Sequence, residues 1–288
     1  MSSRRTVAVQ GRALIRALSR QACRSALARS ARRLDAEEMR RPAMVFAPHP
    51  DDETLGCGGT ILLKRRLDVP VRIVFVTDGS GSHPELLPPK ELSELRAREA
   101  LEASEALGVD ASRVHLLGFP DRYLLEHREE AISRVIALLE EHRPEQLFVP
   151  YAAGENPDHG STCLIVHEAL RRVNRPVTVL EYAVWSWRYW PHVRRDGSLW
   201  DPRTWVRNTA STVRGLVRSS AFRTCVNVHE VLAGKRAALA RHTSQLERRH
   251  GDPRWVTLRD VDGGEFLECF FDGFEFYRRI DFNPRPIS

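Results

Sequence analysis

The sequence has no apolar run of the length that a bilayer crossing requires, and no pair of its cysteines is spaced as C-x-x-C. A transmembrane helix needs about 20 consecutive apolar residues, so none is predicted. The cysteines number five, an odd count that cannot form a complete set of disulfides. Scattered in this way, they are typical of reduced thiols in a cytosol-facing protein. We therefore expect a cytoplasmic location, with peripheral contact at the inner face of a membrane as an alternative.

Other signatures are absent as well. No G-x-G-x-x-G follows the first predicted strand, so a dinucleotide site is not indicated. Internal repeats, a coiled coil and nucleic-acid-binding motifs are also missing, so nucleic acid is not an expected partner. The net charge is nevertheless +6, with an isoelectric point near 9.3. This charge favours anionic partners, such as phosphate-bearing sugars, acidic polysaccharides or anionic lipid surfaces, without choosing among them.

Acidic residues are missing from the chain before Asp35, where Arg, Ala and Ser predominate. Arginines recur at helical spacing along one stripe, and small or apolar residues recur along another. The first stripe is Arg12, Arg16, Arg20 and Arg24, and the second is Leu14, Leu18 and Ala22. This pattern predicts a basic amphipathic helix within an N-terminal extension, residues 1–41. Such a helix could lie on an anionic membrane, serve as a transit peptide, pack on the domain or form a disordered tail.

From residue 42 onward the sequence alternates between strand-like and helical patterns. Strand-like runs cover 44–47, 71–77, 114–118, 147–150 and 177–182, and helical patterns cover 54–66, 92–107, 128–141 and 161–172. Further on, 225–228 and 268–276 are strand-like and 231–246 is helical. The alternation predicts an α/β domain, residues 42–288, with a mainly parallel, Rossmann-like sheet and helices on both faces. A chain of 288 residues is long enough for one such domain.

One histidine and three acidic residues crowd the turn that follows the first predicted strand. They are His49, Asp51, Asp52 and Glu53. Ligands of parallel α/β sheets bind at the carboxyl ends of strands, where this turn must lie. The spacing of His49 and Asp52 lets both converge on one divalent ion, while Asp51 stands beside it as a general base. The alternative is a loop in which Asp51 or Asp52 only caps the following helix.

A second polar turn follows the predicted strand at 147–150. It contains Asn156, Asp158 and His159 near the start of the next helical pattern. His159 is positioned to be a third metal ligand, although a histidine near a helix start is also common on protein surfaces. The two turns together are more specific than either alone, and they predict a hydrolytic metal site with an open coordination position.

These motifs resemble those of the LmbE/PIG-L family of zinc-dependent de-N-acetylases. The matching segments are Pro48–Glu53, Gly56–Gly59, Thr77–Gly79, Arg96–Glu99, Gly118–Asp121, Pro157–His159, Lys235–Leu239 and Ser244–Gln245. The resemblance implies an LmbE-like fold, Zn²⁺ held by His49, Asp52 and His159, and Asp51 as the general base. It runs from about 43 to 182 and again, more weakly, from about 226 to 277.

The second motif departs from the family pattern at Asn156. The family often has a histidine there, which interacts with the oxyanion or the leaving amine. Asparagine can donate a hydrogen bond to an oxyanion, but it cannot supply a proton. Either Asn156 performs this reduced role, or another group such as His192 or Tyr151 supplies the acid, or activity is low.

Further residues are candidates for substrate binding. They are Asp78 in the long polar loop after the second strand, Arg96, Asp121, and Trp185 and His192 in a Trp/Arg-rich insertion at about 185–222. Aromatic faces suit sugar rings and membrane interfaces alike. From Trp205 the insertion predicts a second basic amphipathic helix, which could be a lid, a membrane-contacting flap or a cover that packs on the core.

We therefore expect a zinc-dependent hydrolase that removes the N-acetyl group from an N-acetylated amino-sugar conjugate and releases acetate. The conjugate could be a glycan, a glycolipid or a sugar-containing metabolite, anionic or lipid-linked. One alternative is hydrolysis of a longer N-acyl amide. The other is a sugar- or membrane-binding protein without activity, whose site has decayed at Asn156. The sequence names neither the sugar nor the oligomeric state.

Overall fold

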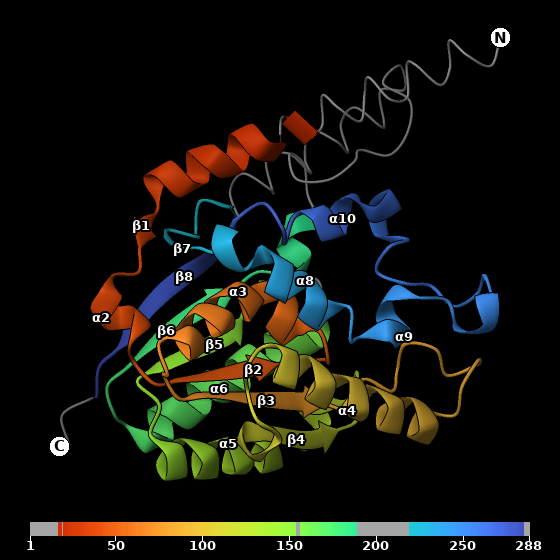
Figure 1. Ribbon diagram of the computed structural model, residues 1–288. Helices are drawn as coiled ribbons and strands as arrows, with labels where there is room; N and C mark the ends of the chain where they lie inside the picture. Colours follow the sequence, from red (N-terminus) through yellow and green to blue (C-terminus); the bar gives the residue numbers. More distant parts are fainter. Residues whose placement is uncertain (1–16, 19, 154–155, 189–218, 285–288) are drawn as a thin grey trace, which may run out of the picture.

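A computed structural model of the protein describes residues 17–18, 20–153, 156–188 and 219–284 (Figure 1). Eight strands form one sheet in the order β1-β7-β8-β6-β5-β2-β3-β4. Five of them are mutually parallel: β2 (Ala43–Ala47), β3 (Val71–Thr77), β4 (Val114–Phe119), β5 (Gln146–Pro150) and β6 (Val177–Tyr182). Residues of β2, β5 and β6 are buried throughout, as continuous apolar runs between two helical layers require. The predicted parallel α/β fold is confirmed.

Three strands extend the sheet beyond β6. Strand β8 (Phe274–Phe282) lies antiparallel between β6 and β7 (Thr224–Asn227), and β1 (Arg32–Arg33) pairs in parallel with β7. The predicted strand at 268–276 was wrong in position. Residues 265–268 are helical as α10 (Glu265–Glu268), and β8 starts after Gly273, whose φ of +94° turns the chain. The sheet also includes two residues of the segment that the sequence assigned to an extension.

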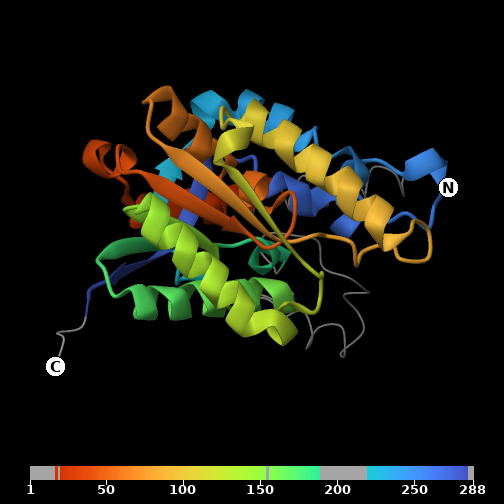
Figure 2. The same cartoon turned by 90° about the horizontal axis from the view of Figure 1, so that it is seen from below.

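Helices cover both faces of the sheet. On one face lie α3 (Asp52–Arg66), α4 (Pro89–Ala106) and α8 (Leu232–Leu239); on the other lie α5 (Arg128–His142) and α6 (Pro157–Val173). Figure 2 shows α5 and α6 side by side, with α4 and α8 on the opposite face. The helix predicted at 231–246 is divided into two helices, α8 and α9 (Thr243–Leu246). A further short helix, α2 (Ala36–Met39), precedes β2. Among the described residues, no helix combines the length and apolar character that a bilayer crossing needs.

The order of the parallel strands creates a crevice at the centre of the sheet. From β2 the chain winds outward through β3 and β4, then returns to β5 on the other side of β2. Connections therefore leave β2 and β5 in opposite directions, and ligands of open α/β sheets bind at such a switch point. The turns after these two strands are the two polar motifs of the sequence, at 48–53 and 156–159.

The glycine-rich part of α3 is held by a buried ion pair. Lys235 Nζ lies 2.8 Å from Glu275 Oε1, and the side chains are 0% and 2% exposed. Lys235 donates to Leu55 O at 2.9 Å, and Glu275 accepts from Gly59 N at 2.7 Å. At Gly56 an added Cβ would lie 2.2 Å from the Tyr182 ring. The small residues of α3 thus allow the helix to lie directly against the sheet.

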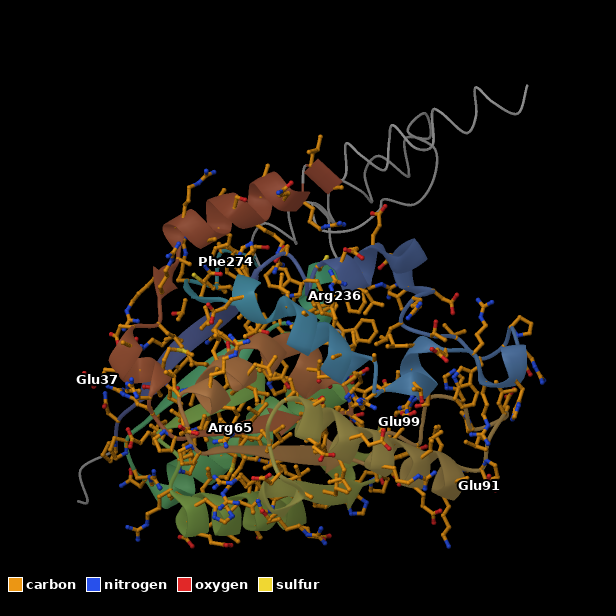
Figure 3. All side chains as sticks on the ribbon, in the orientation of Figure 1. Glu37, Arg65, Glu91, Glu99, Arg236 and Phe274 are labelled. Carbon is orange, nitrogen blue, oxygen red and sulfur yellow. The ribbon has the colours of Figure 1, made fainter. Side chains whose placement is uncertain are left out.

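Residues 20–30 form a helix that packs on the domain through its arginine side. Arg24 is 3% exposed, whereas Leu18 is 55% exposed. The Arg24 guanidinium lies 4.5 Å from the Trp187 ring centroid, donates to Phe274 O at 3.2 Å and pairs with Asp272. Figure 3 shows Phe274 beneath this helix. In the described part of this segment Arg24 faces the domain, whereas Leu18 and Ala22 of the other stripe are exposed, which favours packing on the domain among the alternatives for this helix.

We expect Arg24→Leu to lower the melting temperature by about 5 °C or more. The substitution removes a buried cation–π contact and leaves Asp272 without its cation, which together cost about 2–4 kcal/mol. Arg29→Leu, in an exposed position of the same helix, is the matched control. Differential scanning calorimetry measures both, and equal melting temperatures would show that Arg24 does not anchor the helix.

Candidate active site

The turn after β2 holds Asp51 in a strained conformation. Its φ of +123° lies in a region that residues other than glycine rarely adopt. Such strain persists only where neighbouring groups hold it, and it is common at functional sites. Thr77 donates to Pro48 O from both its N–H and its hydroxyl, at 2.9 and 2.8 Å. Glu53 Oε2 accepts from Asp51 N at 3.0 Å, so the turn is fixed on both sides of His49.

His49, Asp52 and His159 converge as the sequence predicted. Asp52 Oδ2 lies 3.2 Å from His49 Nδ1 and 3.2 Å from His159 Nε2. Zinc bonds of about 2.0–2.1 Å at tetrahedral angles place nitrogen and oxygen ligands roughly 3.3 Å apart. His159 Nε2 is buried and makes no hydrogen bond, so it is available to a cation. The three donors therefore fit a divalent metal ion.

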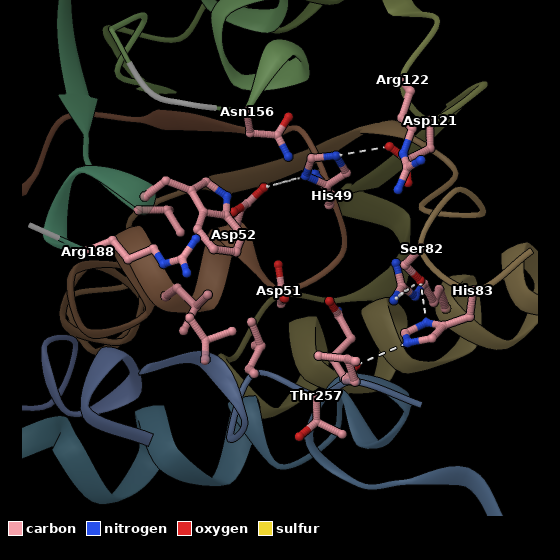
Figure 4. Close-up of a pocket in the computed structure, with 18 of the residues that line it drawn as sticks. His49, Asp51, Asp52, Ser82, His83, Asp121, Arg122, Asn156, Arg188 and Thr257 are labelled. Atoms are coloured by element: carbon pink, nitrogen blue, oxygen red, sulfur yellow. Dashed lines mark hydrogen bonds and ion pairs between the residues drawn. The ribbon is translucent and has the colours of Figure 1, made fainter. Parts of the chain in front are cut away.

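The remaining nitrogen of His49 contacts two further carboxylates. His49 Nε2 lies 3.3 Å from Asp121 Oδ1 (Figure 4). The same nitrogen lies 3.3 Å from Asp158 Oδ2. Carboxylates in this position orient a ligating imidazole and leave its other nitrogen for the metal. Burial lowers the pKa of His49, but hydrogen bonds to Asp121, Asp158 and Asp52 outweigh it, so the pKa lies well above the ordinary histidine value. Asp121, expected to contact substrate, thus supports His49 while also lining the cavity.

Asp51 lies beside the donor set without belonging to it. It is 5% exposed and lines the cavity, where Figure 4 shows its carboxyl group pointing inward. Burial, followed by the charges of Asp52 and Glu53, raises the pKa of Asp51 well above the ordinary value. A carboxyl group with a raised pKa, next to a cation site and open to a cavity, has the environment of a general base.

Asn156 caps the N-terminus of α6 and lines the same cavity. Its Oδ1 accepts from Asp158 N at 2.9 Å as a helix cap. This use of the oxygen leaves the amide nitrogen as the donor, and Figure 4 shows it directed toward His49. Asn156 can therefore donate a hydrogen bond into the cavity, but it has no acidic proton to transfer.

The other expected substrate contacts differ in their positions. Trp185 lines the cavity and stacks on Phe266, with ring centroids 5.1 Å apart. Arg96 also lines it, but its guanidinium is buried and donates to Gly79 O at 2.6 Å and Ser82 Oγ at 2.9 Å. Arg96 thereby shapes the loop after β3.

Two residues with expected roles are not brought to the cavity. Asp78 is not among the described lining residues, because its Oδ1 accepts from Ser80 and from Asp121 N within the loops. Tyr151, an alternative acid, packs against Phe222 instead. His192 and the predicted second basic helix lie outside the described residues.

The cavity has a volume of about 640 Å³. Ser82 and His83 line it from the loop after β3, which was expected at the rim of the pocket, whereas Arg122, Arg188 and residues 256–258 were not predicted. His83 stacks on Trp255 at 4.2 Å and bonds Val256 O at 3.1 Å, which joins the loop after β3 to the segment after α9. No local sequence signal links these segments, whereas Arg122 directly follows a motif that the sequence did single out.

A second buried pair supports the strained turn from behind. His242 Nε2 lies 2.9 Å from Glu53 Oε1, and both side chains are fully buried. Gln245 donates to Pro50 O. Glu99 of α4 accepts from Ser244 N and Oγ, at 2.7 and 2.6 Å, and so attaches α9 to α4 (Figure 3). Helix α9 and the residue before it thus hold the turn that carries Asp51.

Comparison with known sequences agrees with this geometry. The profile of the family described as PIG-L, GlcNAc-PI de-N-acetylase, matches residues 44–170. A Bacillus cereus protein named probable N-acetyl-alpha-D-glucosaminyl L-malate deacetylase 2 is 32% identical over 148 residues, which are 48% of this chain and 66% of that protein. A 1D-myo-inositol 2-acetamido-2-deoxy-alpha-D-glucopyranoside deacetylase of Nocardia farcinica is 29% identical over 238 residues, covering 69% and 78%.

Solved structures share the fold. The N,N'-diacetylchitobiose deacetylase of Pyrococcus horikoshii superposes with a TM-score of 0.57 over 83% of this chain and 84% of that one, at 21% identity. A conserved protein of Thermus thermophilus superposes with a TM-score of 0.54 at 23% identity, over 86% and 99%. At these identities the likeness concerns the fold alone.

In metal-free protein, we expect Asp51→Asn to raise the melting temperature at about pH 8 by a few degrees. In the unfolded chain an aspartate has a pKa of about 3.9. In the native state Asp51 keeps its proton to a higher pH. Wild-type stability therefore falls as the pH rises from about 4 through the folded-state pKa, and asparagine avoids this loss. The difference should shrink toward about pH 4.

Asp52→Asn is the matched control and should lower the melting temperature at about pH 8. His159 and His49 outweigh burial and hold the pKa of Asp52 below its usual range. Its stabilising effect is therefore present above the unfolded-state pKa and is lost in acid. Thermal unfolding of chelator-treated proteins across pH measures both variants. A lower melting temperature for Asp51→Asn at alkaline pH would contradict the assigned environment of Asp51.

Proposed function

The chain belongs to the PIG-L family of de-N-acetylases, and we propose that it hydrolyses the acetamide of an N-acetylglucosamine conjugate. The observation that carries this proposal is the free carboxyl group of Asp51 beside three convergent metal donors. The relatives named above act, by their names, on acetamido sugars joined to malate and to inositol. A cavity of about 640 Å³ has room for a sugar and a small aglycone.

Zinc is the proposed cofactor. Two imidazole nitrogens and one carboxylate oxygen form a donor set common in catalytic zinc sites, which keep a further position open. When bound, the cation would polarise the acetamide carbonyl and lower the pKa of a water molecule. His49, Asp52 and His159 would hold it, with Asp121 and Asp158 fixing the ring of His49.

The residues of the chain would divide the remaining work. Asp51 accepts a proton from the attacking water and later returns it to the leaving amine, so that one carboxyl group serves as base and then as acid. Asn156 donates a hydrogen bond to the developing oxyanion from its amide nitrogen. Trp185 offers an aromatic face to the sugar. This division explains how asparagine can stand where a proton donor is otherwise expected.

Acetate release from N-acetylglucosamine conjugates tests the proposal. We expect Asp51→Asn to lower kcat by about 10²–10⁴-fold because it removes the proton acceptor, while the metal content stays unchanged. Asp52→Asn should lose both metal and activity. Full activity of Asp51→Asn would contradict the mechanism. Bound metal with no acetate release from any conjugate would instead favour the binding-protein alternative, and release of a longer acid would favour the other N-acyl amides.

We further infer that the conjugate carries an anionic group. Arg122 and Arg188 both line the cavity. Arg188 Nε pairs with Asp262 Oδ2 at 2.9 Å, whereas among the described residues the guanidinium of Arg122 has no ion-pair partner. Arg122 N donates to Asp158 Oδ2 at 2.9 Å, and its φ of +73° holds this rim residue in a left-handed conformation. A carboxylate or phosphate on the aglycone would match the free guanidinium.

We expect Arg122→Gln to raise KM for an anionic glucosaminyl conjugate by about 10-fold or more, the effect of one lost charge-assisted hydrogen bond. KM for neutral diacetylchitobiose should change little. Arg128→Gln, which alters the same charge at an exposed position of α5, is the control. An equal change in KM for both substrates in Arg122→Gln would show that this guanidinium does not bind the charged group of the aglycone.

We propose a cytoplasmic location for the protein. All five cysteines are free in the structure, which supports a reducing, cytoplasmic environment. Peripheral membrane contact would rest on residues before 17 and within 189–218, which lie outside the described residues, so it stays a prediction.

A further inference from the structure

A second group of potential metal ligands lies along α6, beyond the first site. His159, Cys163 and His167 follow one another at intervals of four residues on this helix, and Glu181 of β6 faces the last two. Cys163 Sγ lies 3.5 Å from Glu181 Oε1, and His167 Nε2 lies 3.1 Å from the same oxygen. The three donor atoms all lie within 4.8 Å of one another. They come from two elements of the core and from no mobile loop.

The donor separations match a tetrahedral ion. Zinc bonds of about 2.3 Å to sulfur and about 2.0 Å to oxygen, at tetrahedral angles, place the two ligands roughly 3.5 Å apart. The corresponding separation for nitrogen and oxygen is roughly 3.3 Å. Sulfur, imidazole and carboxylate together favour zinc over magnesium or calcium, which prefer oxygen ligands. We propose that Cys163, His167 and Glu181 bind a second Zn²⁺ ion that links α6 to β6.

The ligands of the second site are mostly buried. The side chains of Glu181 and His167 are 3% and 18% exposed, so the ion would be largely shielded from solvent, with His167 the more exposed of these two ligands. Glu181 Oε2 is buried and makes no hydrogen bond, although Arg278 Nη1 lies 3.3 Å away. This oxygen is therefore free to turn toward an ion or to keep its contact with Arg278.

Binding must expel one proton. Burial and the neighbouring Glu181 raise the pKa of Cys163, so in the metal-free protein it is a thiol that donates to Glu181. On coordination the thiol proton passes to solvent and the sulfur binds as thiolate. The ion would then fix the helix whose first turn carries Asn156 and His159, so the second site would steady the first without taking part in its chemistry.

Cobalt titration of the full chain tests this proposal. In an Asp52→Ala background, which disables the first site, we expect one equivalent of Co²⁺ to bind and to show thiolate-to-cobalt charge-transfer absorption. Adding Cys163→Ser should remove this absorption, and adding His167→Gln should weaken binding at least 10-fold, the loss of one of three protein ligands. Cys23→Ser, a substitution at a partly exposed cysteine, is the matched control and should leave the spectrum unchanged.

Zinc-dependent stability gives a second readout that does not depend on cobalt. Zinc should raise the melting temperature of Asp52→Ala, because a ligand that binds only the folded state stabilises it, and His167→Gln should make the rise smaller at the same zinc concentration. The wild-type protein should show the same charge-transfer band, lost in Cys163→Ser alone, even if Asp52→Ala folds poorly. Absence of the band from both the wild type and the background would overturn the proposal. Such a result would leave the first site and its hydrolytic function untouched.

Discussion

The structure depends on one carboxylate oxygen. Asp52 Oδ2 lies within 3.2 Å of both His49 and His159, and it also accepts from His49 N at 3.0 Å. These contacts join the turn after β2 to the start of α6, two segments that the winding of the sheet brings together at its switch point. Without a cation, two imidazoles and several carboxyl groups share a buried space, which is costly. A divalent ion would relieve that cost, and so it fits the electrostatics as well as the geometry.

The surrounding structure is arranged to hold an unfavourable turn. Asp51 is strained and buried next to two other acids, an arrangement that persists only with support from outside. The Glu53–His242 pair and the Gln245 contact supply that support from α9 and the residues before it. The Lys235–Glu275 pair holds the helix that follows, where glycines let it approach Tyr182. The late helices, which lie outside the segment matched by the family profile, therefore contribute directly to the position of the proposed base.

Local sequence signals were sufficient for the parallel half of the fold and for the convergence of the three candidate metal donors. Strands β3 and β6 begin and end where their apolar runs do, and the donors were predicted because they sit in short motifs at strand ends. Long-range partners could not be found in this way. His49 and Asp158 are 109 residues apart, and Glu53 and His242 are 189 apart. Strand β8 was misplaced because apolar residues continue across the Asp272–Gly273 turn. The burial of Arg24 had no local signal, because its aromatic partners, Trp187 and Phe276, are distant in the sequence.

The position of the bound metal tests the account most directly. Anomalous diffraction at the zinc edge, from crystals grown with zinc, locates the ion without assuming any ligand. A peak bonded to His49 Nδ1, Asp52 Oδ2 and His159 Nε2, with the Asp51 carboxyl group close by but not coordinating, is the expected result. No peak at these three atoms, or a peak coordinated by Asp51, would contradict the assignment of Asp51 as the free base.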